Sequence, residues 1–386
     1  MVRPRTNAPS ALAFALALAL ASWHPGAVHA QGPPPDQPDL KIDAKARGEV
    51  IDALVAALDK EYVFPETAAK MAKDLRRRLE AKEYEGIAGA KEFARTLTDH
   101  LRAISKDKHL GVDYSYEAVP VSPPGAPSGP PPEERERMKQ FAARVNYGFE
   151  KVERLEGNVG YLNLRGFMPP EIAGETAAAA MTFLGHSDAL IIDLRQNNGG
   201  EPAMVAFLTS YLFDGEPVHV NDLYFRPEDR TQQWWTLSYV PGKKLGKDKP
   251  VFVLTSRQSF SAAEEFAYNL KNLKRARIVG ETTGGGAHPG EMRRLAEHFA
   301  AFIPNGRAIN PISRTNWEGT GVSPDIESPA EHALKAAHVA ALEAIFQADP
   351  QPQDRMRADH FRKAIDRLRR ELDDARSKPA AKPEPH

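Results

Sequence analysis

Apolar residues recur at helical spacing in three stretches that follow the N-terminal segment of the chain. They are Val50, Ile51, Leu54, Val55 and Leu58, then Met71, Leu75 and Leu79, and then Phe93, Leu97, Leu101 and Ile104. Positions three and four residues apart lie on one face of a helix, and only short segments join the three stretches. The pattern predicts an N-terminal helical bundle domain over residues 44–112.

From about residue 146 onward the pattern is that of an α/β fold. NVGYLNLRGF is predicted to be a strand with Val159 and Tyr161 on one face and Leu162 and Leu164 on the other. The apolar runs DALIIDLR and VFVLT are typical of strands that are covered on both faces. Helical stretches precede the first run and follow the second, so we expect an α/β core over residues 146–330.

The first thirty residues have the pattern of a secretory signal peptide. Two arginines precede the apolar run 11–21, and Val28 and Ala30 occupy the −3 and −1 positions of a cleavage site. No later stretch is long and apolar enough to be a candidate membrane span. The sequence therefore predicts an exported protein, periplasmic or extracellular, without a membrane span after cleavage of residues 1–30.

The remaining segments differ from these units in composition. They are a Pro-rich leader (31–43), a Pro-rich linker with a charged helix (113–145), C-terminal helices (331–375) and a tail expected to be disordered (376–386).

Composition excludes several classes of function. Hydrophobic residues make up 41% and charged residues 27% of the chain, its net charge is −1, and it has no cysteine. This balance is typical of a soluble globular protein without a nucleic-acid partner, and it excludes a thiol nucleophile. The histidines are scattered and there is no HExxH or P-loop motif, so no metal site and no cofactor are expected. The oligomeric state stays open.

The stretch SRQSFSAAEEFA (256–267) carries the first candidate chemistry. Ser261 and Glu264 have the spacing of a capping box before an apolar helical pattern, which by itself indicates only a helix start. The free N–H groups of a helix N-terminus can also stabilise an oxyanion. Ser261 is therefore a candidate nucleophile as well as a cap.

Four stretches together resemble the tail-specific (carboxy-terminal processing) serine peptidases and their relatives, the tricorn core and the interphotoreceptor retinoid-binding proteins. They are DKHLGV (107–112), IIDLRQNNGG (191–200), residues 254–285 and NWEGTGVSPDIE (316–327). The resemblance implies a crotonase/ClpP-like α/β catalytic core and a serine peptidase that acts on peptide or protein substrates.

The resemblance also implies roles for single residues. The family's SASASE motif, laid on QSFSAAEE without gaps, makes Ser261 the nucleophile. The general-base lysine of the processing peptidases falls on Gly286, so that lysine is absent, as in a retinoid-binding-protein-like branch. The tricorn-type relatives instead imply His109 as the base and Glu318 as its acidic partner. His288, two residues beyond the missing lysine, is an alternative base or a substrate-binding residue.

Two further features follow from the same resemblance. The backbone N–H groups of Gly199, Gly200 and Ala262 are expected to form the oxyanion hole. Processing peptidases usually carry a PDZ domain before the core, but roughly 35 residues between Val112 and Tyr147 are too few for one.

Two other functions remain open on this fold. One is a non-catalytic binder of apolar ligands or peptides, and the other is a hydrolase of a non-peptide ester or amide. The first would not need a serine, a histidine and a glycine pair together, whereas the second would use the same triad.

Overall fold

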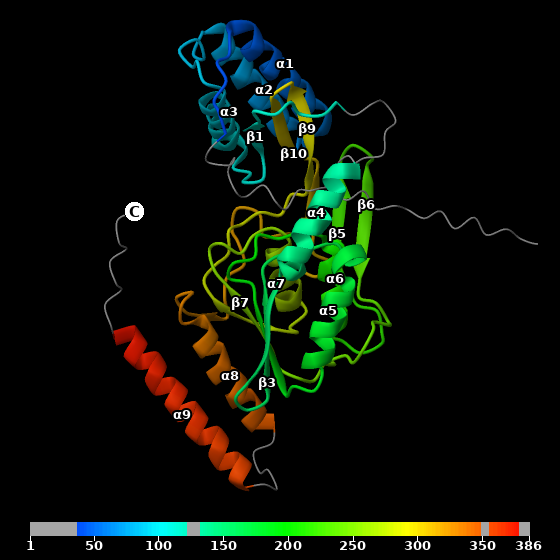
Figure 1. The fold of residues 1–386 in the computed structure, drawn as a ribbon, viewed down its shortest axis with the longest axis vertical. Coiled ribbons are helices and arrows are strands. Elements are labelled where there is room, and N and C mark those ends of the chain that lie inside the picture. Colours follow the sequence, from blue (N-terminus) through cyan, green and yellow to red (C-terminus); the bar gives the residue numbers. More distant parts are fainter. Residues whose placement is uncertain (1–36, 122–131, 349–354, 378–386) are drawn as a thin grey trace, which may run out of the picture.

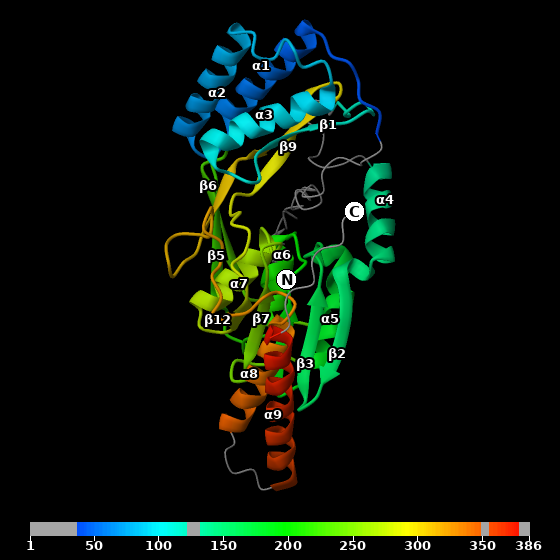
Figure 2. The same cartoon turned by 90° about the vertical axis from the view of Figure 1, so that its left-hand side faces the viewer.

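The molecule is elongated, with a helical domain at one end, an α/β core in the middle and a pair of helices at the other end (Figures 1 and 2). The computed structural model describes residues 37–121, 132–348 and 355–377. The predicted signal peptide (1–30) lies outside the described residues, as do parts of the Pro-rich leader, the linker and the C-terminal tail. Among the described helices none is long and apolar enough to cross a bilayer.

The N-terminal domain consists of three helices and a three-stranded antiparallel sheet. Its helices are α1 (Ala44–Glu61), α2 (Pro65–Glu80) and α3 (Ala90–Ser105), and its strands, in sheet order, are β1 (Gly111–Tyr114), β10 (Phe299–Pro304) and β9 (Gly290–Ala296). The predicted apolar faces of the helices form one buried cluster, in which Ile51, Leu54 and Leu97 are fully buried. The three predicted helices are thus confirmed.

The sheet of this domain departs from the sequence-based division of the chain. Residues 290–304 were expected in the core over 146–330, but β9 and β10 return to the N-terminal domain and pair with β1. The physical reason is burial, because Phe299, Ala301 and Ile303 pack into the same cluster as the three helices. Strand β1 also extends the domain past residue 112, into the predicted linker.

The core contains a six-stranded sheet in the order β12-β8-β7-β4-β3-β2. Its strands are β2 (Phe149–Leu155), β3 (Val159–Leu164), β4 (Ala189–Asp193), β7 (Val251–Thr255), β8 (Arg277–Gly280) and β12 (Ile326–Glu327). All neighbouring pairs are parallel except β2 and β3, which are antiparallel. Parallel strands end together at one edge of a sheet, so the segments after β4 and β7 meet there.

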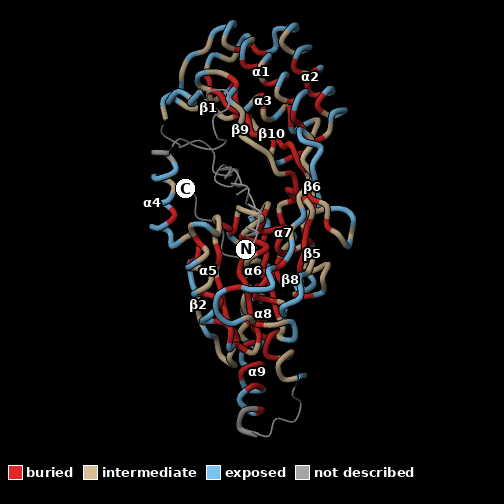
Figure 3. Tube along the Cα trace, turned by 90° about the vertical axis from the view of Figure 1, so that its right-hand side faces the viewer, coloured by how far each residue is buried: buried red, intermediate tan, exposed pale blue. Residues whose placement is uncertain are grey.

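Helices cover both faces of this sheet. On one side are α5 (Pro170–Leu184), α6 (Pro202–Ser210) and α7 (Ala262–Asn272), and on the other are α8 (Ala333–Ala348) and α9 (Arg355–Ser377). Figure 3 shows the buried residues running through the strands between these layers. Val159 and Tyr161 pack toward α8 and α9, whereas Leu162 and Leu164 pack toward α5 and α6, which confirms the predicted faces of β3.

A third sheet connects the two units. It has the order β11-β5-β6, with β5 (His219–Phe225), β6 (Arg230–Trp235) and β11 (Gly306–Ile309). Outside the three sheets and their covering helices, the described chain also contains α4 (Pro132–Arg144) and the short helix η1 (Asn146–Gly148). Strands β10 and β11 are separated only by Asn305, so one segment crosses from the N-terminal domain to the core. Arg226, just after β5, donates to the carbonyl oxygens of Tyr62 and Asp59 at the end of α1. These links join the N-terminal domain to the core, and Lys108, in the turn before β1, donates to the Gly284 carbonyl of the core.

Candidate active site

Ser261 lies at the start of α7, immediately after the turn that follows β7. Its backbone has φ +56° and ψ −121°, a conformation that a residue with a side chain rarely adopts. The Ser261 N–H donates to the Glu264 carboxylate at 2.9 Å, which is one half of the predicted capping box. Ser261 is partly exposed and lines a cavity of about 1000 Å³ between the N-terminal domain and the core.

The neighbouring serine, Ser259, is buried and hydrogen-bonded to the backbone. Its side chain is fully buried, donates to the carbonyl oxygen of Leu194 at 2.7 Å and accepts from the Ser256 N–H at 3.0 Å. These bonds tie the turn after β7 to the end of β4. Of the two serines, only Ser261 lines the cavity.

His109 lies in the turn between α3 and β1 and lines the same cavity as Ser261. The turn is set by Asp107, whose carboxylate accepts the His109 N–H at 3.0 Å. The imidazole ring packs on Phe260, the residue before Ser261, with ring centroids 4.6 Å apart. Burial lowers the pKa of His109 to about 4, so the ring is neutral near pH 7.

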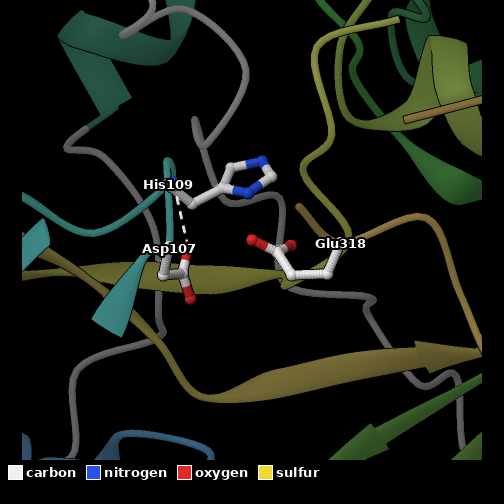
Figure 4. A group of neighbouring side chains, drawn as sticks. All are labelled: Asp107, His109 and Glu318. Atoms are coloured by element: carbon white, nitrogen blue, oxygen red, sulfur yellow. Dashed lines mark hydrogen bonds between the residues drawn. The ribbon is translucent and has the colours of Figure 1, made fainter. Parts of the chain in front are cut away.

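Figure 4 shows Glu318, which comes from a different segment of the chain, with its carboxylate facing the His109 ring. A ring nitrogen of His109 and one carboxylate oxygen each of Asp107 and Glu318 lie within 4.8 Å of one another. Glu318 Oε2 accepts the Ala287 N–H at 2.5 Å. Burial, followed by the charge of Asp107, raises the pKa of Glu318 to about 7. The structure thus brings Glu318 near His109.

His288, the alternative base, is held by Asp107 in a buried pair. Its Nδ1 lies 2.7 Å from Asp107 Oδ2 and 3.5 Å from Glu318 Oε2, and it is absent from the lining of the cavity that contains Ser261. Burial lowers the pKa of His288, but the Asp107 hydrogen bond and the nearby carboxylates outweigh it and raise the pKa overall. Tyr62 also donates to Asp107, at 3.2 Å.

Sequence reasoning did not single out Asp107. The available signal was its place in DKHLGV, where an aspartate two residues before the histidine can accept that residue's N–H. Its pairing with His288 joins positions 181 residues apart, which no local pattern shows.

Glu264 does more than cap α7. Its buried carboxylate accepts the N–H groups of Gly285 and Gly286, at 2.6 and 2.8 Å, and the Thr283 hydroxyl at 2.5 Å. Together with the bond from Ser261, these contacts fix the glycine-rich loop against the start of the helix. The sequence indicated only the capping role.

Gly286, at the place of the family's lysine, lies against the His109 ring. A Cβ atom there would be 2.7 Å from His109 Cε1 and 2.3 Å from Phe260 Cζ. Both distances are shorter than any ordinary carbon contact. The space that a side chain at position 286 would need is therefore filled by His109 and Phe260.

A Gly286→Ala variant should therefore lose activity by displacing the imidazole. A misplacement of about 1 Å can lower a rate about 10²-fold, and we expect a fall in kcat/KM of that size. Gly215→Ala is the matched control, because a Cβ at position 215 meets nothing within 4 Å. Equal kcat/KM for both variants would contradict this placement of His109.

Of the predicted oxyanion-hole residues, Ala262 follows Ser261 in the chain and Gly199 lies against both. Gly199 has φ +109°, and a Cβ there would lie 2.7 Å from Ser261 Cβ and 3.0 Å from the Ala262 nitrogen. The Gly199 N–H, however, donates to the side chain of Asn197 at 2.8 Å. Gly200 has φ +140° and packs against the carbonyl of Phe167. Of the three expected donors, the N–H of Gly199 is thus already bonded.

Asp193 and Arg195 brace the end of β4. The Arg195 guanidinium donates to both Asp193 oxygens, at 2.9 and 2.5 Å, and to the Ala330 carbonyl at 2.5 Å. Tyr161 donates to Asp193 at 2.7 Å.

The fold that holds this group of side chains is α/β. Residues 158–328 match the model of peptidase family S41, and residues 44–156 match the N-terminal domain of that family in eukaryotic IRBP. The chain belongs to peptidase family S41.

Individual relatives agree with this assignment over part of their length. A stretch of 115 residues is 34% identical to the tail-specific protease of Haemophilus influenzae and covers 28% of this chain and 15% of that protein. Another, of 196 residues, is 29% identical to the carboxy-terminal-processing protease of Bartonella bacilliformis and covers 48% of this chain and 43% of that protein. The chain thus spans less than half the length of these relatives.

Among solved structures, a putative peptidase from Parabacteroides merdae has a similar fold. The TM-score is 0.54 at 16% identity, over 77% of this chain and 96% of that one. At this level of identity the likeness describes the fold alone.

Proposed function

We propose that the protein is a serine peptidase in which Ser261 is the nucleophile, His109 the general base and Glu318 the carboxylate that orients the base. The observation that carries the proposal is the shared cavity of Ser261 and His109, with Glu318 close behind the imidazole. The fixed place of His109 beside the side-chain-free Gly286 supports a histidine in the role that a lysine fills in relatives.

In this mechanism His109 accepts the proton of the Ser261 hydroxyl as its oxygen attacks the scissile carbonyl. Glu318 faces the ring and stabilises the imidazolium that forms. The N–H groups of Gly200 and Ala262 are the proposed oxyanion donors, because that of Gly199 is bonded to Asn197. His109 then protonates the leaving amine, and water releases the acyl group in a second step.

The substrate we propose is a peptide or protein segment. The cavity wall includes many charged side chains, among them Arg95, Arg102, Lys108, Asp39 and Asp99. Such a wall suits a polar peptide backbone better than an apolar ligand, which disfavours the alternative of an apolar-ligand binder. We also propose that the protein acts after export, because of the predicted signal peptide.

Hydrolysis of a fluorogenic peptide library by the purified protein tests this function. Turnover of peptides that stops on treatment with a fluorophosphonate is the expected result. Turnover of simple esters without any peptide cleavage would instead favour the non-peptide hydrolase.

Activity should persist at lower pH than an ordinary histidine base allows. Burial lowers the pKa of His109 to about 4; Asp107 opposes this shift, whereas His288 and Arg102 add to it. The base must be unprotonated, so kcat/KM should fall only as the pH drops through this lowered pKa, well below the usual value of about 6.5. A pH profile of kcat/KM measures this limb, and a fall centred near 6.5 would contradict a buried ring in the free enzyme.

A further inference from the structure

The three side chains Asp107, His109 and Glu318 have a chemistry that the peptidase mechanism does not use. One ligand-type atom from each lies within 4.8 Å of the other two, and this is the one such group of three within residues 37–121, 132–348 and 355–377. Imidazole nitrogen and carboxylate oxygen are common ligands of zinc. The sequence predicts no metal site, because His109 and Glu318 are more than two hundred positions apart and meet only in the fold.

Two atoms of this group are buried without partners. Neither His109 Nδ1 nor Glu318 Oε1 has a hydrogen-bond partner among the described residues, and both are shielded from solvent. A desolvated lone pair without a partner is unfavourable. Figure 4 shows the Glu318 carboxylate and the His109 ring facing one another, so a single cation between them would satisfy both.

The charges at this point also favour a cation. Asp107 and Glu318 share one histidine, His288, whose Nδ1 lies 2.7 Å from Asp107 Oδ2 and 3.5 Å from Glu318 Oε2, so a bound cation would stabilise the ionised form of both carboxylates. Ligand atoms around tetrahedral zinc lie roughly 3.3 Å apart, within reach of small side-chain rotations from the observed positions.

We propose that Asp107, His109 and Glu318 form an inhibitory binding site for Zn²⁺. The inhibition rests on the proposed function and follows from the chemistry of the imidazole ring. A neutral ring has one N–H and one lone pair. If the Nδ1 lone pair binds zinc, the hydrogen is on Nε2, and the ring cannot accept the Ser261 proton there. Zinc and catalysis therefore exclude one another at His109.

Zinc uptake by the purified protein tests the site without reference to activity. Competition with a chromophoric zinc chelator should show one equivalent bound to the wild type and to Ser261→Ala. Loss of a ligand should weaken binding by at least about 10–100-fold in Glu318→Gln and in His109→Gln. His219→Ala is the control, because His219 and Asp222 form another histidine–carboxylate pair, at 2.7 Å, outside the site. Thermal unfolding checks that each variant folds.

Zinc should also stop peptide hydrolysis by the wild type, and EDTA should restore it. Absence of zinc uptake by the folded wild type, or equal uptake by the wild type and both ligand variants, would overturn the proposal. Zinc uptake measured on the Ser261→Ala variant, which is expected to be inactive, tests metal binding independently of peptidase activity. A protein that binds zinc at these residues and cleaves no peptide would refute only the proposed function, whereas a zinc-insensitive peptidase would refute only the metal site.

Discussion

Replacement of Ser261 by alanine should abolish peptide hydrolysis, with kcat lower by about 10⁶-fold. The hydroxyl is the attacking group in the proposed mechanism, and in the described structure no other serine lines the cavity that His109 lines. The fold should survive, because loss of an N-cap side chain costs about 1 kcal/mol. Steady-state kinetics on the wild type and the variant measure the effect, and circular dichroism checks the fold.

Ser259→Ala is the matched control for this experiment. Its hydroxyl bonds the Leu194 carbonyl and the Ser256 N–H inside the core, so its loss should reduce the free energy of unfolding by about 1–3 kcal/mol. Where the variant remains folded, most of its activity should remain. A dead Ser259→Ala protein beside an active Ser261→Ala protein would reverse the assignment of the nucleophile.

Replacement of His109 by alanine should lower kcat almost as far as loss of Ser261, because the members of a triad act as a unit. The ring is neutral, packs on Phe260 and lines the cavity of the serine, so it is the proposed proton acceptor. The measurement is kcat at a pH where the wild type is fully active, with substrate binding followed separately.

His288→Ala should have a different signature. Removal of His288 takes the ion-pair partner from the buried Asp107 carboxylate and leaves the neutral Tyr62 hydroxyl and His109 N–H as its donors, which should reduce the free energy of unfolding by about 3–5 kcal/mol. The expected loss is thus mainly in stability, measured by denaturant unfolding, with a far smaller change in kcat than for His109→Ala. An inactive but stable His288→Ala protein, beside an active His109→Ala protein, would move the base to the loop that carries His288.

The sequence predicted those parts of the fold that local periodicity encodes. The helical stretch expected before the run DALIIDLR is α5, and the runs DALIIDLR and VFVLT contain the central strands β4 and β7, which are buried on both faces. The sheet of the N-terminal domain was not predicted. Its strands pair residues far apart in sequence, such as Gly111 with Phe302, and they are stabilised by packing against the three helices. Local patterns contain no record of such distant pairs.

The same limit applies to the candidate site. Ser261 was found from a motif and its place at a helix start, and the structure puts it, with His109, on one cavity. The burial that lowers the pKa of His109, and the pairing of Asp107 with His288, arise only when the N-terminal domain meets the core. The bond between Gly199 and Asn197 depends on side-chain orientation in a tight turn, which spacing does not specify.

Reaction of the wild-type protein with a fluorophosphonate, followed by mass spectrometry of the adduct, tests the central claim most directly. The reagent phosphonylates a serine only where a base takes up its proton and the oxyanion is stabilised. The account predicts a single adduct on Ser261 that forms in the wild type and not in His109→Ala. An adduct on another serine, or none on the folded wild-type protein, would contradict it.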